Sequence, residues 1–371
     1  MTLTPEQLLA GPRGRRLCME YAVRSAHAVR FQALASATFY ASYQRSVAQG
    51  LGAVLYGNPA LYDNPAEQDI PNPSAAEVAD LIRQADLNEP DGTEAFEALR
   101  EAVDAATYWQ RPSGEDVLAA EPALRDALEW LAQLVTASPS TGWWAEPIDR
   151  TRQYAVRFEH LPHPTADPAA ALAAEHAALL EEETRARRDS PSDPTAAYGG
   201  CWWSRPAVAL LSTTRELGSA GPAGLTLFED RMNWTAADVA PVTLDDAARV
   251  YEITGPDDWA HLCRIRPVDV TAARRCCWFL TTGVDRTWVL PDWRAVAEDY
   301  DAVHLTVAGY LSTAGRAIDV GAGRSSVLAG WNPDESRWLT GAAAVSGPAT
   351  RWVCAEEPHW YEPRWYPESA V

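Results

Sequence analysis

The sequence predicts an α+β protein in which a helical N-terminal half packs on a tryptophan-rich, mixed or antiparallel β-sheet domain. Three observations predict this class: apolar residues recur at helical spacing in the first half, β-type alternation follows in the second, and 12 of the 16 tryptophans lie in 201–371. The expected domains are residues 1–190, mainly helical, and residues 191–371, β-rich and carrying a catalytic or ligand-binding site.

Capping residues mark three helix starts in the first half. Thr4-Pro5-Glu6-Gln7 and Ser74-Ala75-Ala76-Glu77 each form a capping box, and Asp167 followed by Pro168 begins an alanine-rich helix to about Arg188. Apolar spacing near 3.6 predicts further helices within 93–109 and 115–135.

The second half reads as short strands with two helices between them. The helices would start at Asp257 and at Pro291-Asp292, where Asp292 is placed to cap. The segment 189–200 is the best linker candidate because it is rich in Pro, Ser, Asp and Gly. The predicted strands are 152–160, 207–214, 224–230, 248–254, 286–292, 302–311 and 325–331.

One loop stands apart from these elements. Residues 56–74 hold three Asn-Pro steps and two tyrosines, which predict an extended, turn-rich segment. A loop of this length is either a lid over a site or a plain connection.

Composition excludes several chemistries. The chain has no lysine, a bias typical of a high-GC bacterium such as an actinobacterium, so all 31 basic residues are arginines. Schiff-base, pyridoxal phosphate, P-loop and kinase lysine chemistry are therefore excluded. A net charge of −20 argues against nucleic acid as a partner.

The expected setting is the cytoplasm. No apolar run is long enough to span a bilayer, and no signal peptide is visible at the N-terminus, so no membrane partner is expected. The six cysteines form no CxxC pair and are expected to be reduced, mostly buried thiols.

The predicted strand 302–311 places two polar side chains together. By the period-two rule its aliphatic residues share one face, which leaves His304 and Thr306 side by side on the other. Two such groups fit the floor of a polar cleft. The alternative is a histidine held in the core by a backbone partner.

A second cluster surrounds Glu335. This carboxylate follows the turn Asn332-Pro333-Asp334 and is flanked by Trp331 and Trp338, where desolvation is expected to raise its pKa. The alternative is a solvated residue on an edge strand. Most tryptophans are expected to be core, with Trp331, Trp338 and the pair 202–203 as candidates for an aromatic pocket wall.

A third cluster is the strand 248–254, where Arg249 and Tyr251 alternate with Val250. Arginine grips pyrophosphate in a bidentate manner, although a solvated arginine is equally compatible with this pattern.

Other site motifs are weaker. No GxSxG elbow occurs, and 321-GAGRSS-326 reads as a hairpin turn and not as a phosphate cradle. His160 and His163 could share a metal, but two histidines in a proline-containing loop more often bind none, so no metal site is predicted.

The order of these clusters over residues 248–340 resembles the ADP-ribosyltransferase fold, in which an early Arg or His, a middle Ser, Thr or Tyr, and a late Glu cradle NAD. The resemblance implies that Arg249 and Tyr251 contact the cofactor and that Glu335 polarises the ribose. It further implies that Thr306, with His304 or Ser312, lines the nicotinamide pocket beside Trp331. The chain lacks the family's Ser-Thr-Ser string and Glu-x-Glu pair.

The expected function is therefore an enzyme acting on a nucleotide or sugar-like small molecule, with NAD as substrate in an ADP-ribosyl transfer or glycohydrolysis reaction. Glu335 and His304 are the expected catalytic residues. Two alternatives stay open: a non-catalytic protein that recognises a partner through its tryptophans, and an enzyme of specialised metabolism with a small-molecule pocket closed by the Asn-Pro loop.

Overall fold

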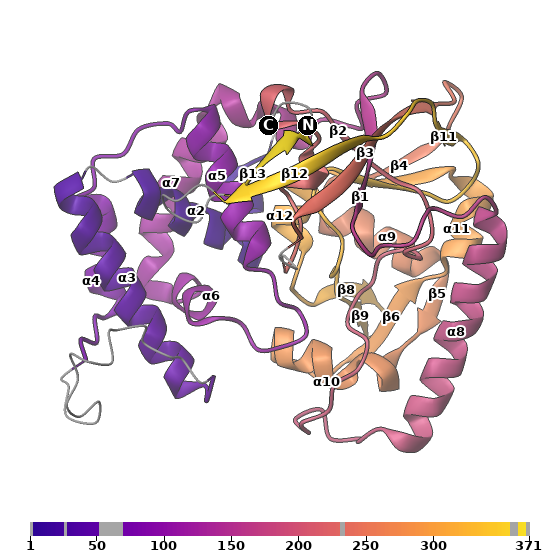
Figure 1. Ribbon diagram of the computed structural model, residues 1–371. Coiled ribbons are helices and arrows are strands. Elements are labelled where there is room, and N and C mark those ends of the chain that lie inside the picture. Colours follow the sequence, from indigo (N-terminus) through magenta and orange to yellow (C-terminus); the bar gives the residue numbers. More distant parts are fainter. Residues whose placement is uncertain (1–2, 26–27, 52–69, 231–233, 357–362, 369–371) are drawn as a thin grey trace. The chain divides into compact units, whose positions relative to one another are not determined.

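The computed structural model describes residues 3–25, 28–51, 70–230, 234–356 and 363–368. Helices fill the N-terminal half and mixed sheets the C-terminal half, which confirms the predicted class (Figure 1). Most of the loop 56–74 lies outside the described residues. Among the described residues, no helix combines the length and apolar character required to traverse a bilayer.

The chain divides into two compact units, but the boundary between them is not at residue 190, where the sequence predicts it. Residues 4–102 and 112–141 form a helical unit, and residues 103–111 and 142–371 form most of a β-rich unit. Residues 142–190, which the sequence pattern assigns to the helical half, belong with the sheets because their strand pairs with two strands from beyond residue 210.

The helical unit is held by a close-packed apolar core. Leu8, Leu17 and Leu131 are fully buried where three of its helices meet. Both predicted capping boxes, at Thr4 and Ser74, are present. Its helices are α1 (Pro5–Ala10), α2 (Pro12–Ser25), α3 (Ala28–Ala48), α4 (Ala75–Arg83), α5 (Gly92–Asp104), α6 (Gly114–Ala119) and α7 (Arg125–Ala137), with the 3-10 turn η3 (Pro122–Leu124).

The β-rich unit contains a large sheet of nine described strands in the order β13-β12-β3-β1-β2-β10-β7-β4, with β11 also paired to β3. All pairs are antiparallel except β4 and β7. The strands are β1 (Gln153–Phe158), β2 (Ser212–Arg215), β3 (Ala236–Leu244), β4 (Val250–Ile253), β7 (Ala302–Leu305), β10 (Glu335–Trp338), β11 (Ala343–Val345), β12 (Thr350–Glu356) and β13 (Pro363–Pro367).

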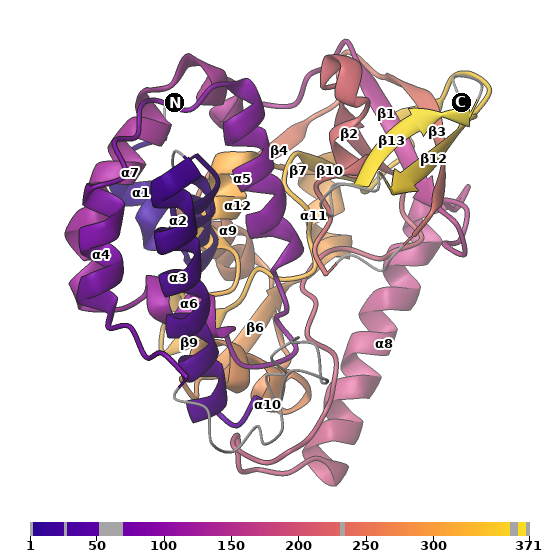
Figure 2. The same ribbon diagram turned by 60° about the vertical axis from the view of Figure 1, so that its left-hand side comes forward.

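A second, four-stranded sheet has the order β5-β6-β9-β8, and its last hairpin contains the glycine turn at 321–323 that the sequence predicts. Helix α8 packs against α10 and α11 and appears as the long pink helix in Figures 1 and 2. The remaining elements are β5 (Pro267–Asp269), β6 (Thr287–Pro291), β8 (Ile318–Gly321), β9 (Arg324–Ser326), α8 (Pro168–Asp189), α9 (Pro256–Ile265), α10 (Thr271–Thr282), α11 (Trp293–Asp299), α12 (Val307–Thr313) and the 3-10 turns η4 (Pro139–Ala145), η5 (Gly218–Ala220) and η6 (Ala223–Leu225).

Four strand predictions are wrong in whole or in part. The runs 207–214 and 325–331 are strands only at 212–214 and 325–326. Residues 224–230 form no strand, since the chain makes a 3-10 turn at Ala223–Leu225 and then continues irregularly. The run 302–311 is a strand only to Leu305, after which Thr306 caps helix α12 by accepting a hydrogen bond from the Gly309 amide. The Thr306 hydroxyl makes the turn locally favourable, and this outweighs the β-type alternation.

Candidate functional site

A pocket of about 280 Å³ opens in the β-rich unit beside strands β1, β2 and β10. Its walls are largely apolar. Polar groups lie along β2 and β10, and an ion pair between Arg157 of β1 and Asp238 of β3 also lines the pocket. The apolar lining includes Tyr154, Val156, Phe158, Leu161, Leu210 and Phe228, and the polar lining includes Ser212, Thr213, Thr214, Asn332, Glu335 and Arg337.

The Glu335 carboxylate and the Arg337 guanidinium form an ion pair in this pocket. Glu335 Oε1 lies 2.7 Å from Arg337 Nη2, and each side chain is only 8% exposed. Oε2 accepts hydrogen bonds from the Asn332 backbone N–H at 3.2 Å and from its side-chain amide at 3.0 Å. Oε2 thus has two donors and Oε1 has one, so lone-pair capacity for a ligand donor remains on Oε1.

The spacing of Glu335 and Arg337 along β10 explains why both side chains lie on one face of the sheet. Residues two apart on a strand share a face, and residues opposite each other across an antiparallel pair also share it. Arg337 stands opposite Ser212, so the ion pair and this hydroxyl project to the same side of the sheet.

Two exposed apolar side chains also line the pocket. Val208 is 47% exposed and Val345 50%, and both line the pocket together with the exposed His163. Exposed large apolar groups beside a concave, mostly apolar pocket are typical of a ligand site.

Charged groups also lie near the ion pair without lining the pocket. Burial raises the pKa of Glu175 on α8 to about 7, against the opposing effects of a hydrogen bond from the Ala207 backbone and of the Arg205 and Arg337 charges. Burial and the Arg337 charge lower the pKa of Arg205 to about 10, against the attraction of Glu335. A pocket that adjoins such perturbed groups is a stronger candidate for function than an apolar cavity alone.

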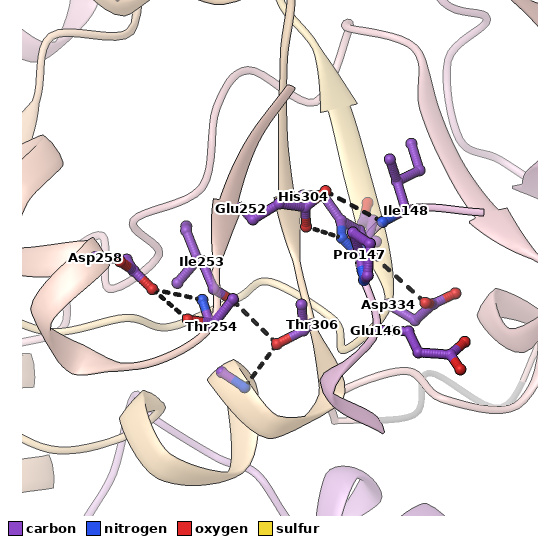
Figure 3. Close-up of polar contacts among 12 residues, drawn as sticks. Glu146, Pro147, Ile148, Glu252, Ile253, Thr254, Asp258, His304, Thr306 and Asp334 are labelled. Carbon is purple, nitrogen blue, oxygen red and sulfur yellow. Dashed lines mark hydrogen bonds and ion pairs between the residues drawn. The ribbon is translucent and has the colours of Figure 1, made fainter. Parts of the chain in front are cut away.

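His304 belongs to a separate buried chain of charges (Figure 3). Its Nδ1 lies 2.5 Å from Glu252 Oε2 and its Nε2 lies 3.4 Å from Asp334 Oδ1, and the ring is 1% exposed. Asp334 in turn accepts hydrogen bonds from Arg215 Nε at 2.6 Å and from the Arg215 backbone N–H at 2.9 Å. Arg215 extends to Glu146 Oε2, 3.2 Å away and largely exposed.

The two carboxylates keep the imidazole charged. Burial alone would lower the pKa of His304, but the hydrogen bonds and charges of Asp334 and Glu252 outweigh it and raise the pKa to about 9. Burial likewise opposes ionisation of Asp334, yet His304 and Arg215 hold the pKa of this carboxyl below its usual value.

His304 and Glu335 do not meet in a common hollow, so the expectation that both face one cleft is wrong. His304 stands opposite Ser336 in the pairing of β7 with β10, whereas Glu335 stands opposite Leu305. Since neighbours along a strand point to opposite faces, the sheet separates the two side chains. His304 is not among the residues that line the pocket.

The other residues assigned to NAD binding do not line the pocket either. Thr306 donates to the Ile253 carbonyl as the cap of α12, and Ser312 donates to the Ala308 carbonyl within that helix. Thr306 is thus a helix cap in place of the predicted strand position, and Ser312, which follows the predicted strand, lies in the buried helix α12.

Arg249 and Tyr251 have structural partners. Arg249 is half-exposed and pairs with Asp301 at 3.1 Å, and Tyr251 donates to the Asp258 carbonyl at 3.0 Å. Trp331 and Trp338 are fully buried, and their indole N–H groups donate to the Glu335 carbonyl and to the Thr213 hydroxyl. Aromatic rings do line the pocket, but they belong to tyrosine and phenylalanine.

The sequence patterns did not predict that Arg337 lines the pocket or that Arg215 belongs to the charged chain. The signal for Arg337 was present, because the spacing Glu-x-Arg on a strand places both charges on one face. No local pattern marks Arg215, whose partners lie 69 and 119 positions away.

Within the described residues, no group of three or more His, Cys, Asp or Glu side chains is arranged to hold a metal ion. Comparison with models of known protein families, with curated proteins and with solved structures finds no match to this chain.

Proposed function

We propose that this protein is an enzyme that binds a sugar-like small molecule, such as the ribose of a nucleoside, in the pocket beside β1, β2 and β10. One observation carries the proposal: a buried carboxylate–guanidinium pair, Glu335 with Arg337, lies in an otherwise largely apolar pocket. Pockets of this construction, with few polar groups among apolar walls, are the usual form of small-molecule sites.

The chemistry of the polar groups favours hydroxyl-rich ligands. A hydroxyl both donates and accepts, so adjacent hydroxyls of one sugar can donate to Glu335 and accept from Arg337 at the same time. The ion pair carries no net charge, which removes the need for a charged ligand. The half-buried rings of Phe228 and Tyr154 offer apolar surface for the C–H face of a sugar.

The pocket's size limits the ligand. Sites for drug-sized molecules run from about 300 to 1,000 Å³, so a volume of about 280 Å³ is suited to a sugar ring with one attached group. A whole dinucleotide would extend beyond it. In an ADP-ribosyl transfer or glycohydrolysis reaction, this volume would take the ribose and nicotinamide end of NAD.

Glu335 would act electrostatically. Cleavage of a bond at the anomeric carbon develops positive charge on the sugar, and a fixed carboxylate stabilises that charge. Arg337 and Asn332 would hold the carboxylate in place during the reaction. Among the residues that the family resemblance assigns to NAD, Glu335 alone lines the pocket and supports NAD chemistry. The others bond to protein groups and do not line the pocket.

A second candidate is recognition of the same ligands without turnover. It is favoured by the two hydrogen bonds and the ion pair that already engage both Glu335 oxygens, because a carboxylate neutralised by a guanidinium stabilises a developing positive charge less strongly.

The test combines a reaction assay with a binding assay on wild type, Glu335→Gln and the matched control Glu298→Gln, which removes an exposed carboxylate outside this pocket. Each protein is incubated with NAD while released nicotinamide is measured. Each is also melted in the presence of adenosine, nicotinamide riboside, D-ribose and methyl glycosides.

Release of nicotinamide by wild type and Glu298→Gln, lost in Glu335→Gln, would support the enzymatic proposal in its NAD form. A melting shift that Glu335→Gln alone abolishes, without turnover, would support recognition. If no compound shifts the melting temperature of wild type and no nicotinamide appears, the proposal for this pocket is overturned.

A further inference from the structure

Asp334 joins the two sides of the sheet. Its Oδ1 faces His304 and Arg215, and its Oδ2 accepts a hydrogen bond at 3.1 Å from the Thr214 hydroxyl, a residue of the pocket wall. On either side of it along the chain, Pro333 and Glu335 both line the pocket. One carboxylate therefore connects the buried charged chain to the pocket.

The backbone at Asp334 needs support. Asp334 has φ of 57°, in the left-handed region that non-glycine residues rarely adopt. Its carboxylate is 3% exposed and bonded on both oxygens. Those bonds hold the turn Asn332-Pro333-Asp334 in this conformation, and the turn carries the Asn332 amide that bonds Glu335.

A buried chain of charges is not explained by stability alone, since apolar residues of similar volume often stabilise a core at least as well. This chain alternates in sign through Glu252, His304, Asp334, Arg215 and Glu146. Such a network fixes geometry because each of its three inner members, His304, Asp334 and Arg215, is held by two charged neighbours.

We propose that His304 is a positioning residue of the pocket: its imidazolium holds Asp334, and through this turn it sets the place of Asn332 and Glu335 on the opposite face of the sheet. The inference rests on the proposed function of the pocket. His304 does not touch the ligand, and its role is exerted through Asp334.

The charged groups that face His304 are Glu252 from β4 and Asp334 from the turn before β10. Behind Asp334 stands Arg215 of β2. Loss of the His304 proton leaves two carboxylates beside a neutral ring, which weakens the hold on Asp334. The Asn332 side-chain amide, which donates to Glu335 and accepts from the Glu229 backbone, should then change its environment.

The experiment follows the side-chain amide of Asn332 by NMR in protein labelled with ¹⁵N-asparagine, from pH 6 to 9.5, without any ligand. Asn332→Ser assigns the resonance, and Asn88 of the helical unit is the internal control. The proposal expects the Asn332 amide to titrate together with the His304 ring in wild type and to lose this titration in His304→Gln.

Glu252→Gln provides an independent variant if His304→Gln fails to fold. It removes one of the two carboxylates, so the midpoint of the Asn332 titration should move to lower pH. An Asn332 resonance that does not follow the His304 titration, or that titrates identically in wild type and both variants, overturns the proposal. Since no ligand is present, this result is independent of whether the pocket binds a sugar.

Discussion

The charge on His304 makes a quantitative prediction about stability. The pKa of His304 rises from 6.5 to about 9 on folding, because Asp334 and Glu252 more than offset the cost of burial. The folded state therefore holds this proton more tightly than the unfolded state. Its contribution to stability is fully present below pH 6.5 and is lost as pH rises toward 9.

The magnitude follows from the two pKa values. At about 1.4 kcal/mol per pKa unit, the charged histidine contributes about 3 kcal/mol to the free energy of unfolding at low pH. Between pH 6 and pH 8.5 about 2 kcal/mol of this should disappear. This is a large fraction of the roughly 5–15 kcal/mol by which folded domains are stable.

The assay is urea-induced unfolding at several pH values between 6 and 8.5, for wild type, His304→Gln and the control His163→Gln, in which the lost histidine is exposed. The range stops at 8.5 because burial raises the pKa of Cys201 to about 11 and of Cys263 to about 12. These thiols ionise first in the unfolded chain and therefore also destabilise the fold at higher pH.

Wild type and His163→Gln should lose about 2 kcal/mol more than His304→Gln across this range. Stability curves of wild type and His304→Gln that run parallel would refute the reasoning. So would an NMR titration of the wild-type ring with a midpoint near 6.5, a measurement that does not depend on the variant folding.

Two further predictions concern packing. A Cβ at Gly309 would lie 2.1 Å from the Ile253 carbonyl oxygen, so Gly309→Ala should destabilise the fold by about 1–3 kcal/mol or more in a thermal unfolding assay. The control is Gly142→Ala, which should be near neutral in the same assay because a Cβ there would have nothing within 4 Å. Trp338→Phe removes the indole N–H that donates to the buried Thr213 hydroxyl. The free energy of unfolding, measured by chemical denaturation, should fall by about 1–3 kcal/mol. A change near zero would contradict the importance of this hydrogen bond.

Local patterns were sufficient wherever the physical cause is local. The capping boxes at Thr4 and Ser74, the Asp167 and Asp292 caps and the hairpin at 321–323 all depend on residues within a few positions of each other. Composition likewise determined the absence of lysine chemistry, and the alternating runs located β1, β4 and β6.

Local competition explains where those patterns failed. The run from Ala302 to Leu311 alternates like a strand, but Thr306 caps a helix there and Gly309 lets that helix approach β4 closely. The first effect depends on the Thr306 hydroxyl and the second on the missing side chain of Gly309. The spacing of apolar residues contains neither piece of information.

The sequence by itself determined the fold class, the exclusion of lysine-dependent reactions and the importance of Glu335 as a candidate. Only the tertiary structure decided which side chains surround Glu335. The spacing along β10 already places Arg337 on the same face as Glu335, but strand pairing buries this pair in the sheet and places His304 on the far face. Strand order also joins Asp334 to Arg215 across 119 positions. Which side chains meet depends on register and strand order, and these are set by long-range packing that no short stretch of sequence contains.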